Sequence, residues 1–222
     1  MWIQIPDLAL PLRTIFCIGR NYAEHAKELG NAVPTEPVVF LKPVSAVCYS
    51  GSSILIPKAS NRVDHEVEIV VALKDGGKTL TSAQALQCIG GYGIGIDVTA
   101  RDIQERLKQK VLPWAIAKGF DTFAVLGSFV PTSKVKNFDE LSFQLKVNDV
   151  LKQKGCVKEM IFSIPELISY LSSIFTLSAG DIIFTGTPSG VGVLKAHDVV
   201  KAEMHCGSDV LASLQVSVKE AP

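Results

Sequence analysis

Three acidic residues alternate along one short segment of the sequence. Asp64, Glu66 and Glu68 stand two positions apart, and on a β-strand this spacing directs all three side chains to one face. Like charges on one face repel, and burying each without a partner costs several kcal/mol. The face is therefore either solvated or neutralised by a cation. The apolar run 69–73 is typical of a strand buried on both faces, which argues against a solvated edge.

Asp97 is a fourth acidic residue that could join this group. It ends the glycine-rich segment 90–96 and precedes a helix predicted to begin at Thr99. A carboxylate in this position either projects into a pocket or caps the helix, and the spacing leaves both interpretations open. Ligation by carboxylate oxygens suits Mg²⁺ or Mn²⁺, or Ca²⁺, rather than Zn²⁺.

His25 and Glu28 form a second pair with chemical potential. They stand three residues apart on a short predicted helix and therefore share a face. A carboxylate that touches an imidazole raises its basicity, which suits a general base acting on water. The same spacing is common in surface ion pairs, so that alternative stays open. Gly30 and the segment 31–34 after the helix are compatible with a mobile lid.

Two loops carry candidate anion-binding groups. The segment 185–192 is not a Walker loop, but it could present backbone N–H groups and Thr187 to a carboxylate, or it could be a plain hairpin. Arg20 follows the first clear strand and could hold an anionic substrate. Further cationic candidates are Lys42, Arg101 and Lys118.

The elements that must position these residues are mostly strands. Segments rich in β-branched and aromatic residues predict strands at 14–18, 38–41, 54–56, 66–73, 93–97, 143–147, 181–185, 199–204 and 210–218. Helices are predicted at 22–29, 82–89, 99–108 and 164–175, the last after a capping box of Ser163 and Glu166. Many strands without βαβ alternation predict an α+β protein with packed mixed or antiparallel sheets.

Composition excludes several classes of protein. With 47% hydrophobic residues among 222, the chain can bury a sizeable core. Lys plus Arg and Asp plus Glu are equal at 22 each, which argues against a nucleic-acid or polybasic membrane surface. Five widely spaced cysteines predict free thiols. No secretory signal or membrane span is visible. We expect a cytoplasmic protein, with a mitochondrial form that has lost its presequence as the alternative.

Seven ordered motifs together resemble the fumarylacetoacetate hydrolase (FAH) family. They are GRNYAEH at 19–25, FLKP at 40–43, DHEVE at 64–68, GIDVTARD at 95–102, KGFDTF at 118–123, MIFSIPELI at 160–168 and GDIIFTGTPSGVG at 180–192. The resemblance implies the C-terminal-domain fold of that family, a mixed β-sandwich roll with a few short helices that forms homodimers. It implies one catalytic domain over 1–222, with 1–15 as a lead-in segment.

The resemblance also assigns roles to individual residues. It implies a Mg²⁺ or Mn²⁺ ion, with Ca²⁺ as an alternative, held by Glu66, Glu68 and Asp97. Asp64 is left a structural role. By the same similarity, the catalytic residues are the water-activating pair His25 and Glu28, on a helix that closes over substrate, and the charge-stabilising Lys118. The implied substrate contacts are Arg20, Gln104 and Thr187.

The implied substrate is a small keto acid. The first expectation is hydrolysis of a C–C bond in an acylpyruvate, a 2,4-diketo acid such as fumarylpyruvate or acetylpyruvate. The alternatives are decarboxylation of oxaloacetate, or tautomerisation of oxaloacetate or a 2-hydroxydienoate, at the same metal. A non-catalytic, metal-stabilised binding protein is a minor alternative. The family often has a proline-flanked CPLGP segment where 123–128 stands here, and Gly where Asp149 stands, so the substrate stays open.

Overall fold

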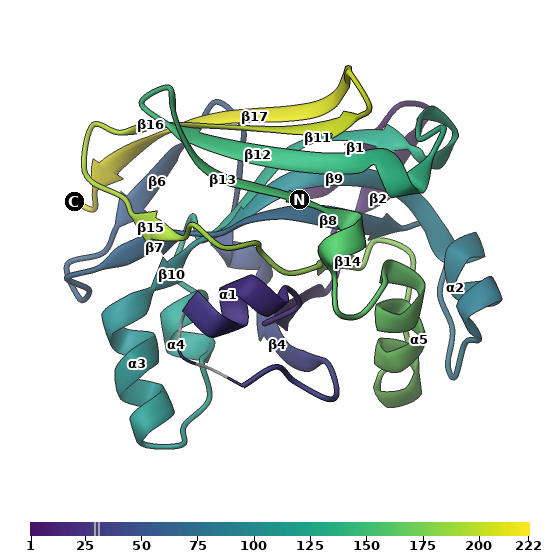
Figure 1. Ribbon diagram of the computed structural model, residues 1–222, viewed down its shortest axis with the longest axis horizontal. Coiled ribbons are helices and arrows are strands. Elements are labelled where there is room, and N and C mark those ends of the chain that lie inside the picture. Colours follow the sequence, from purple (N-terminus) through teal and green to yellow (C-terminus); the bar gives the residue numbers. More distant parts are fainter. Residues whose placement is uncertain (29, 31) are drawn as a thin grey trace.

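Two facing β-sheets form the centre of the computed structural model, which describes residues 1–28, 30 and 32–222 (Figure 1). From edge to edge, the larger sheet contains β4 (Val38–Lys42), β3 (Ile15–Gly19), β14 (Ile182–Phe184), β8 (Val67–Leu73), β9 (Ile89–Asp97), β11 (Ala124–Pro131) and β5 (Val47–Tyr49). The second contains β13 (Val150–Cys156), β12 (Leu141–Val147), β16 (Val199–Cys206), β17 (Asp209–Glu220) and β6 (Ser53–Ile56). Both sheets mix parallel and antiparallel pairs, so the predicted mixed β-sandwich of the α+β class is confirmed.

Strand β8 is buried on both faces, as its apolar sequence predicts. Ile69 and Val71 point into the main core between the two sheets. Val70 and Ala72 point into a second core on the opposite side of the larger sheet. This alternation follows from the two-residue period of a strand, and it leaves the beginning of β8 as the place where polar residues can gather.

The lead-in segment is a β-hairpin rather than a simple extension. Strands β1 (Trp2–Ile5) and β2 (Leu8–Pro11) pair antiparallel. Ile3, Ile5 and Leu10 are buried in the second core. The hairpin therefore covers the face of the larger sheet that the second sheet leaves open.

Most predicted helices are confirmed, with small shifts at their ends. The α-helices are α1 (Ala23–Glu28), α2 (Ser82–Cys88), α3 (Arg101–Gln109), α4 (Ala115–Lys118) and α5 (Ile164–Ile174). Short 3₁₀ turns occupy Val44–Ala46, Thr132–Lys134, Phe138–Glu140 and Val157–Glu159. The predicted capping box of Ser163 and Glu166 begins α5. The predicted end of the first helix at Leu29, and Asn31 in the segment after it, lie outside the described residues.

The predicted start of the third helix at Thr99 is wrong by two residues. Thr99 belongs to β10 (Thr99–Ala100), which pairs with β7 (Val63–His65) in a small sheet completed by β15 (Gly192–Val193). Helix α3 follows without a side-chain cap. Asp102, in the first turn of α3, accepts hydrogen bonds from the Ser60 hydroxyl and the Asn61 amide.

The cysteines and the helices can be compared with the composition. In the part of the chain that the structure describes, all five cysteine thiols are free. Among the same residues, no helix combines the length and the apolar character that crossing a bilayer requires.

Candidate metal centre and active site

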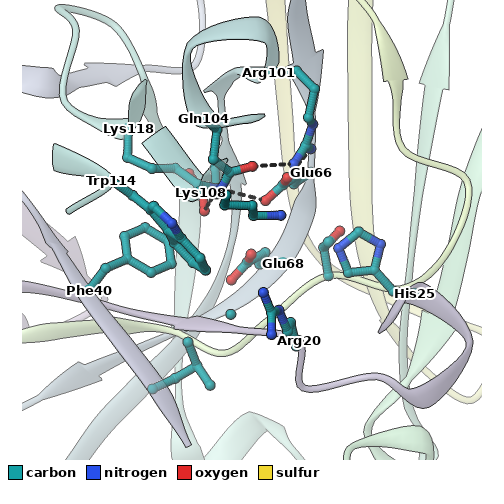
Figure 2. A pocket seen from close by; sticks show the side chains of 14 residues that line it. Arg20, His25, Phe40, Glu66, Glu68, Arg101, Gln104, Lys108, Trp114 and Lys118 are labelled. Atoms are coloured by element: carbon teal, nitrogen blue, oxygen red, sulfur yellow. Dashed lines mark hydrogen bonds and ion pairs between the residues drawn. The ribbon is translucent and has the colours of Figure 1, made fainter. Parts of the chain in front are cut away.

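A pocket lies where the ends of β3, β8 and β9 meet helices α1, α3 and α4 (Figure 2). About 370 Å³ of space in it is free of protein atoms, with the solvent at its open mouth included. The lining includes each residue that the resemblance assigns to the site except Glu28, which stands behind His25: Arg20, His25, Glu66, Glu68, Asp97, Gln104, Lys118 and Thr187. Folding thus brings these residues together from distant parts of the sequence.

Three buried carboxylates form the floor of the pocket. Glu66 sits in the break between β7 and β8, Glu68 on β8, and Asp97 at the end of β9. The antiparallel pairing of β8 with β9, closed by the Asp97 amide donating to the Glu66 carbonyl (2.8 Å), places the strand ends side by side. One oxygen from each carboxylate lies within 4.8 Å of the others. Asp97 ends a strand and belongs to the pocket, so the helix-cap interpretation is wrong.

Asp64 does not join this group, because the strand is interrupted at Glu66. Its carboxylate accepts hydrogen bonds from Arg101 Nε (2.9 Å) and Arg62 Nε (3.1 Å). The expectation of one strand face carrying all three acidic residues is therefore wrong. Asp64 instead holds Arg101, which also pairs with Glu66.

Buried cations balance part of the negative charge. Lys118 Nζ lies 2.8 Å from Glu66 and 2.6 Å from Asp97, and also donates to the Thr99 hydroxyl at 2.7 Å. Lys42 Nζ lies 2.7 Å from the second oxygen of Asp97. Lys118 therefore stands between two carboxylates, where it already interacts with negative oxygen.

The carboxylates keep capacity for a further cation. Glu68 accepts one hydrogen bond, from the Gly186 amide at 2.7 Å. Burial, followed by the neighbouring Asp97 and Glu66 charges, raises the pKa of Glu68 well above its usual value. Asp97 Oδ1 accepts no hydrogen bond of good geometry from the described residues. Carboxylate oxygens suit a hard divalent ion, and Glu68 has no cationic partner among the described residues, so the residues present fit one.

His25 lies beside these carboxylates and is held by Glu28. Its Nδ1 is 3.3 Å from Glu28 Oε2, and the Gly190 amide donates to the same carboxylate at 3.0 Å. Because a carboxylate can only accept, Nδ1 carries the proton and Nε2 is left as an acceptor. Burial lowers the pKa of His25, against the opposing effects of Glu66 and Glu28. The neutral imidazole is the form that can take a proton.

Thr187 is fixed by a side chain that the sequence analysis did not single out. Gln153 of β13 donates to the Thr187 hydroxyl (2.8 Å) and accepts from the Val67 amide (3.1 Å). The Thr187 hydroxyl donates to the Val67 carbonyl (2.8 Å). Gln153 also pairs with His65 Nδ1 at 2.8 Å. Strand β13 was not predicted, and no local pattern indicated this network.

The pocket wall contains three more residues that the sequence analysis did not assign to it. Phe40 and Trp114 stack edge to face with their ring centroids 5.7 Å apart, and Lys108 extends from α3 beside them (Figure 2). Gln104 and Lys108 are four residues apart and share a helix face. That spacing is the signal that could have identified Lys108.

Comparison with known proteins decides the family. The model for the C-terminal domain of fumarylacetoacetate hydrolase matches residues 14–219. The chain belongs to this family. It is 46% identical to the mitochondrial oxaloacetate tautomerase FAHD1 of Arabidopsis thaliana, over 92% of each chain. It is 45% identical to the mitochondrial oxaloacetate decarboxylase of Dictyostelium discoideum, over 85% of this chain and 87% of the relative.

Solved structures of the FAH family agree with these relatives. The fumarylpyruvate hydrolase of Pseudomonas aeruginosa, solved with Mn²⁺ and pyruvate, has a TM-score of 0.90 and 34% identity. The alignment covers all of this chain and 96% of that one. The predicted FAH resemblance is therefore confirmed. The chain is an enzyme of this family, and its three clustered carboxylates could hold a divalent metal.

Proposed function

We propose that this FAH-family enzyme binds a 2-oxo acid on a Mg²⁺ or Mn²⁺ ion held by Glu66, Glu68 and Asp97 and forms its enolate. The observation that carries the proposal is the buried carboxylate trio with Lys118 and a neutral His25 beside it. A divalent ion supplies Lewis-acid polarisation of the keto oxygen. These side chains supply the proton transfers and the balance of charge.

Oxaloacetate is the substrate that the relatives favour, since two of them are named for its tautomerisation or decarboxylation. Conversion of keto to enol oxaloacetate removes a proton from carbon and places one on oxygen. His25 Nε2 is available to accept the first proton and, once protonated, to return it to the oxygen. The three N–H bonds of Lys118 are donated to Glu66, Asp97 and Thr99, so Lys118 offsets negative charge on the oxygen through its own positive charge. Preorganised electrostatic stabilisation of this kind is worth about 3 kcal/mol in the transition state.

Hydrolysis of an acylpyruvate is the second candidate, and the His25–Glu28 pair favours it. With Nδ1 donating to Glu28, Nε2 can take a proton from a water that attacks the distal carbonyl. The C–C bond then breaks, and pyruvate departs as the enolate, beside which Lys118 lies. Decarboxylation of oxaloacetate reaches the same enolate without water. The three reactions therefore differ in their need for His25 as a base.

Turnover assays on the purified protein test the proposal. Enol–keto conversion of oxaloacetate, CO₂ release and acetylpyruvate cleavage are measured separately with Mg²⁺ or Mn²⁺ and again with EDTA. We expect metal-dependent turnover of at least one substrate. His25→Ala should abolish acetylpyruvate cleavage and leave decarboxylation. Turnover that persists in EDTA would contradict the metal role, and no turnover of any 2-oxo acid would favour a binding protein.

The assembly and the location of the protein can also be proposed. We propose a homodimer in the cytoplasm that takes a small keto acid, with the mitochondrion as the alternative compartment that the names of the relatives suggest. Analytical ultracentrifugation tests the assembly, because a homodimer has twice the 23.9 kDa mass of this chain. Microscopy of the tagged protein in its own cells tests the location.

A further inference from the structure

Two cations lie close to one tryptophan at the wall of the pocket. Arg20 Cζ lies 5.8 Å from the centroid of the Trp114 ring, and Lys108 Nζ lies 5.5 Å from it. Both side chains line the pocket and direct their charged ends into the space that Glu68 faces (Figure 2). Residues far apart in the sequence thus present two positive charges to one volume.

Among the described residues, neither cation has a carboxylate partner. Arg101 and Lys118, the other basic residues of the lining, are paired with Asp64, Glu66 or Asp97. Over residues 1–28, 30 and 32–222, no ion pair within 4.0 Å involves Arg20 or Lys108. Burial and then the nearby Arg20 charge lower the pKa of Lys108. The protein therefore holds like charges together without neutralising them.

The backbone is arranged to hold Arg20 in this position. Arg20 has a φ of 61°, in the left-handed region, which costs a residue with a Cβ about 1–3 kcal/mol. The preceding Gly19 lets Trp114 approach, because a Cβ there would lie 3.3 Å from Trp114 Cζ3. Such strain is characteristic of ligand clamps.

The charge of the pocket sets the charge of its ligand. Four Lys or Arg side chains and three carboxylates line it, which is a net charge of plus one, and a divalent ion would raise this to plus three. A 2-oxo acid brings one carboxylate to the metal. The two unpaired cations then remain, and a second carboxylate on the same ligand would neutralise them.

We propose that Arg20 and Lys108, both within 6 Å of the centre of the Trp114 ring, bind the distal carboxylate of a 2-oxo dicarboxylate and so select dianionic substrates over monocarboxylate ones. The inference rests on the proposed function and names its substrate class. Lys108 is the new residue in this assignment, a specificity-determining contact on α3. Arg20 supplies a planar guanidinium that can bind the carboxylate through two hydrogen bonds.

Binding of an unreactive ligand pair tests this selection without turnover. Malate chelates metal through its 2-hydroxy acid group and carries a distal carboxylate, whereas malate 4-methyl ester has nearly the same shape and a neutral distal end. Calorimetry with the Mn²⁺-loaded protein gives both dissociation constants. Lys108→Met keeps an unbranched apolar side chain and removes the charge, and Lys108→Arg keeps the charge. Lys110→Met removes a charge from the exposed end of α3 and serves as the control.

We expect the native protein to prefer malate over its ester by about tenfold or more, which corresponds to about 1.4 kcal/mol. Lys108→Met and Arg20→Gln should each remove most of this preference while the ester binds as before. Lys108→Arg and Lys110→Met should keep it. The unchanged ester affinity shows that each variant is folded.

Four results would overturn the inference. They are a native protein that does not prefer malate, a Lys108→Met variant that keeps the preference, equal weakening of both ligands by Lys108→Met, and binding of neither ligand. A preference that follows these residues in a protein without keto-acid turnover would support the subsite and refute the proposed reaction. Keto-acid turnover by a protein that does not prefer malate would support the proposed reaction and refute the subsite.

Discussion

At the scale of single residues, two of the three acidic residues of the site have different partners and opposite pKa shifts. Glu66 is paired with two cations, and their effect lowers its pKa despite burial. Glu68 has no cationic partner among the described residues, and its pKa is raised. The same burial therefore has opposite outcomes two residues apart, because Arg101 and Lys118 contact only Glu66 of the pair.

Replacement of Glu68 by Gln should separate folding stability from metal binding. Gln can still accept the Gly186 N–H bond, and it removes a buried charge that Asp97 and Glu66 disfavour. Without metal, we expect the free energy of unfolding to rise by about 1 kcal/mol. The native protein should gain about 2.7 kcal/mol at a Mn²⁺ concentration near 100 Kd, and Glu68→Gln should lose this gain. Urea unfolding with EDTA or Mn²⁺ measures both, and equal Mn²⁺ stabilisation would exclude Glu68 as a ligand.

The His25–Glu28 pair predicts the direction of a pH shift. Because burial lowers the pKa of His25 below 6.5, activity that needs the neutral base should fall only on the acid side of that value. Glu28 raises this pKa, so Glu28→Gln should move the acid limb of kcat/KM to lower pH and reduce the plateau. Glu24→Gln, on the exposed face of α1, should leave the limb in place. A limb that moves to higher pH in Glu28→Gln would refute the assignment.

At the scale of elements, the loop 185–190 ties the metal centre to the catalytic helix. Its Gly186 amide holds Glu68 and its Gly190 amide holds Glu28. Between these contacts, Gln153 fixes Thr187 and the Pro188 carbonyl. One loop thus sets the relative position of a predicted ligand and a predicted base.

Loss of the Gln153 amide should therefore destabilise the fold. Gln153 is 1% exposed, and Gln153→Leu would leave the buried Val67 amide without an acceptor. This costs about 1–3 kcal/mol. The half-buried Gln144, which contacts Glu203 on the neighbouring strand, is the matched control, and its replacement by Leu should cost less than about 1 kcal/mol. Urea denaturation measures both, and equal losses would show that the network adds nothing beyond burial.

Periodicity and capping predicted most of the elements but not their junctions. All nine predicted strands are present, with ends shifted by up to four residues. Strands β11 and β13 are among those that were missed, the first because Gly127 and Ser128 interrupt its apolar pattern and the second because the polar run 152–154 occupies its centre. The break at Glu66, on which the site depends, was also missed. Pairing with β10 and β15 ends β7 there, and such long-range contacts leave no local signal.

The site shows the same division between local and long-range information. From spacing alone, metal binding by Glu66 and Glu68 was one of two hypotheses, and Asp97 could be either a metal ligand or a helix cap. The family motifs identified the full group, which the fold then gathers in one pocket. Lys108 belongs to no motif. Its spacing of four residues from Gln104 is its one local signal, and its place beside Trp114 is set by the fold.

At the scale of the whole molecule, the larger sheet lies between two cores. The second sheet covers one face, and the β1–β2 hairpin contributes to the core on the other. Gly95 of β9 lets neighbouring side chains close over the sheet, because a Cβ there would lie 2.7 Å from Phe184 and Val70. The pocket opens at the strand ends of the larger sheet, beyond the two hydrophobic cores.

The N-terminal hairpin should be an integral part of this body. Ile5 is 4% exposed and packs in the second core, so Ile5→Ala should lower the free energy of unfolding by about 2–4 kcal/mol. Trp2 on the same strand is 54% exposed, and Trp2→Ala should cost less than about 1 kcal/mol. Chemical denaturation of the two variants checks this. A cost for Ile5→Ala no larger than for Trp2→Ala would mean that the hairpin is dispensable.

The contacts of Thr187 have one more consequence. Its only hydroxyl hydrogen is committed to the Val67 carbonyl, and Gln153 occupies one of its two lone pairs. A ligand oxygen that hydrogen-bonds to this hydroxyl must therefore bring its own hydrogen. An enol or a water molecule has that hydrogen, whereas a ketone or a carboxylate does not. In a wall otherwise rich in cationic donors, this oxygen is a group that can distinguish one tautomer of a substrate from the other.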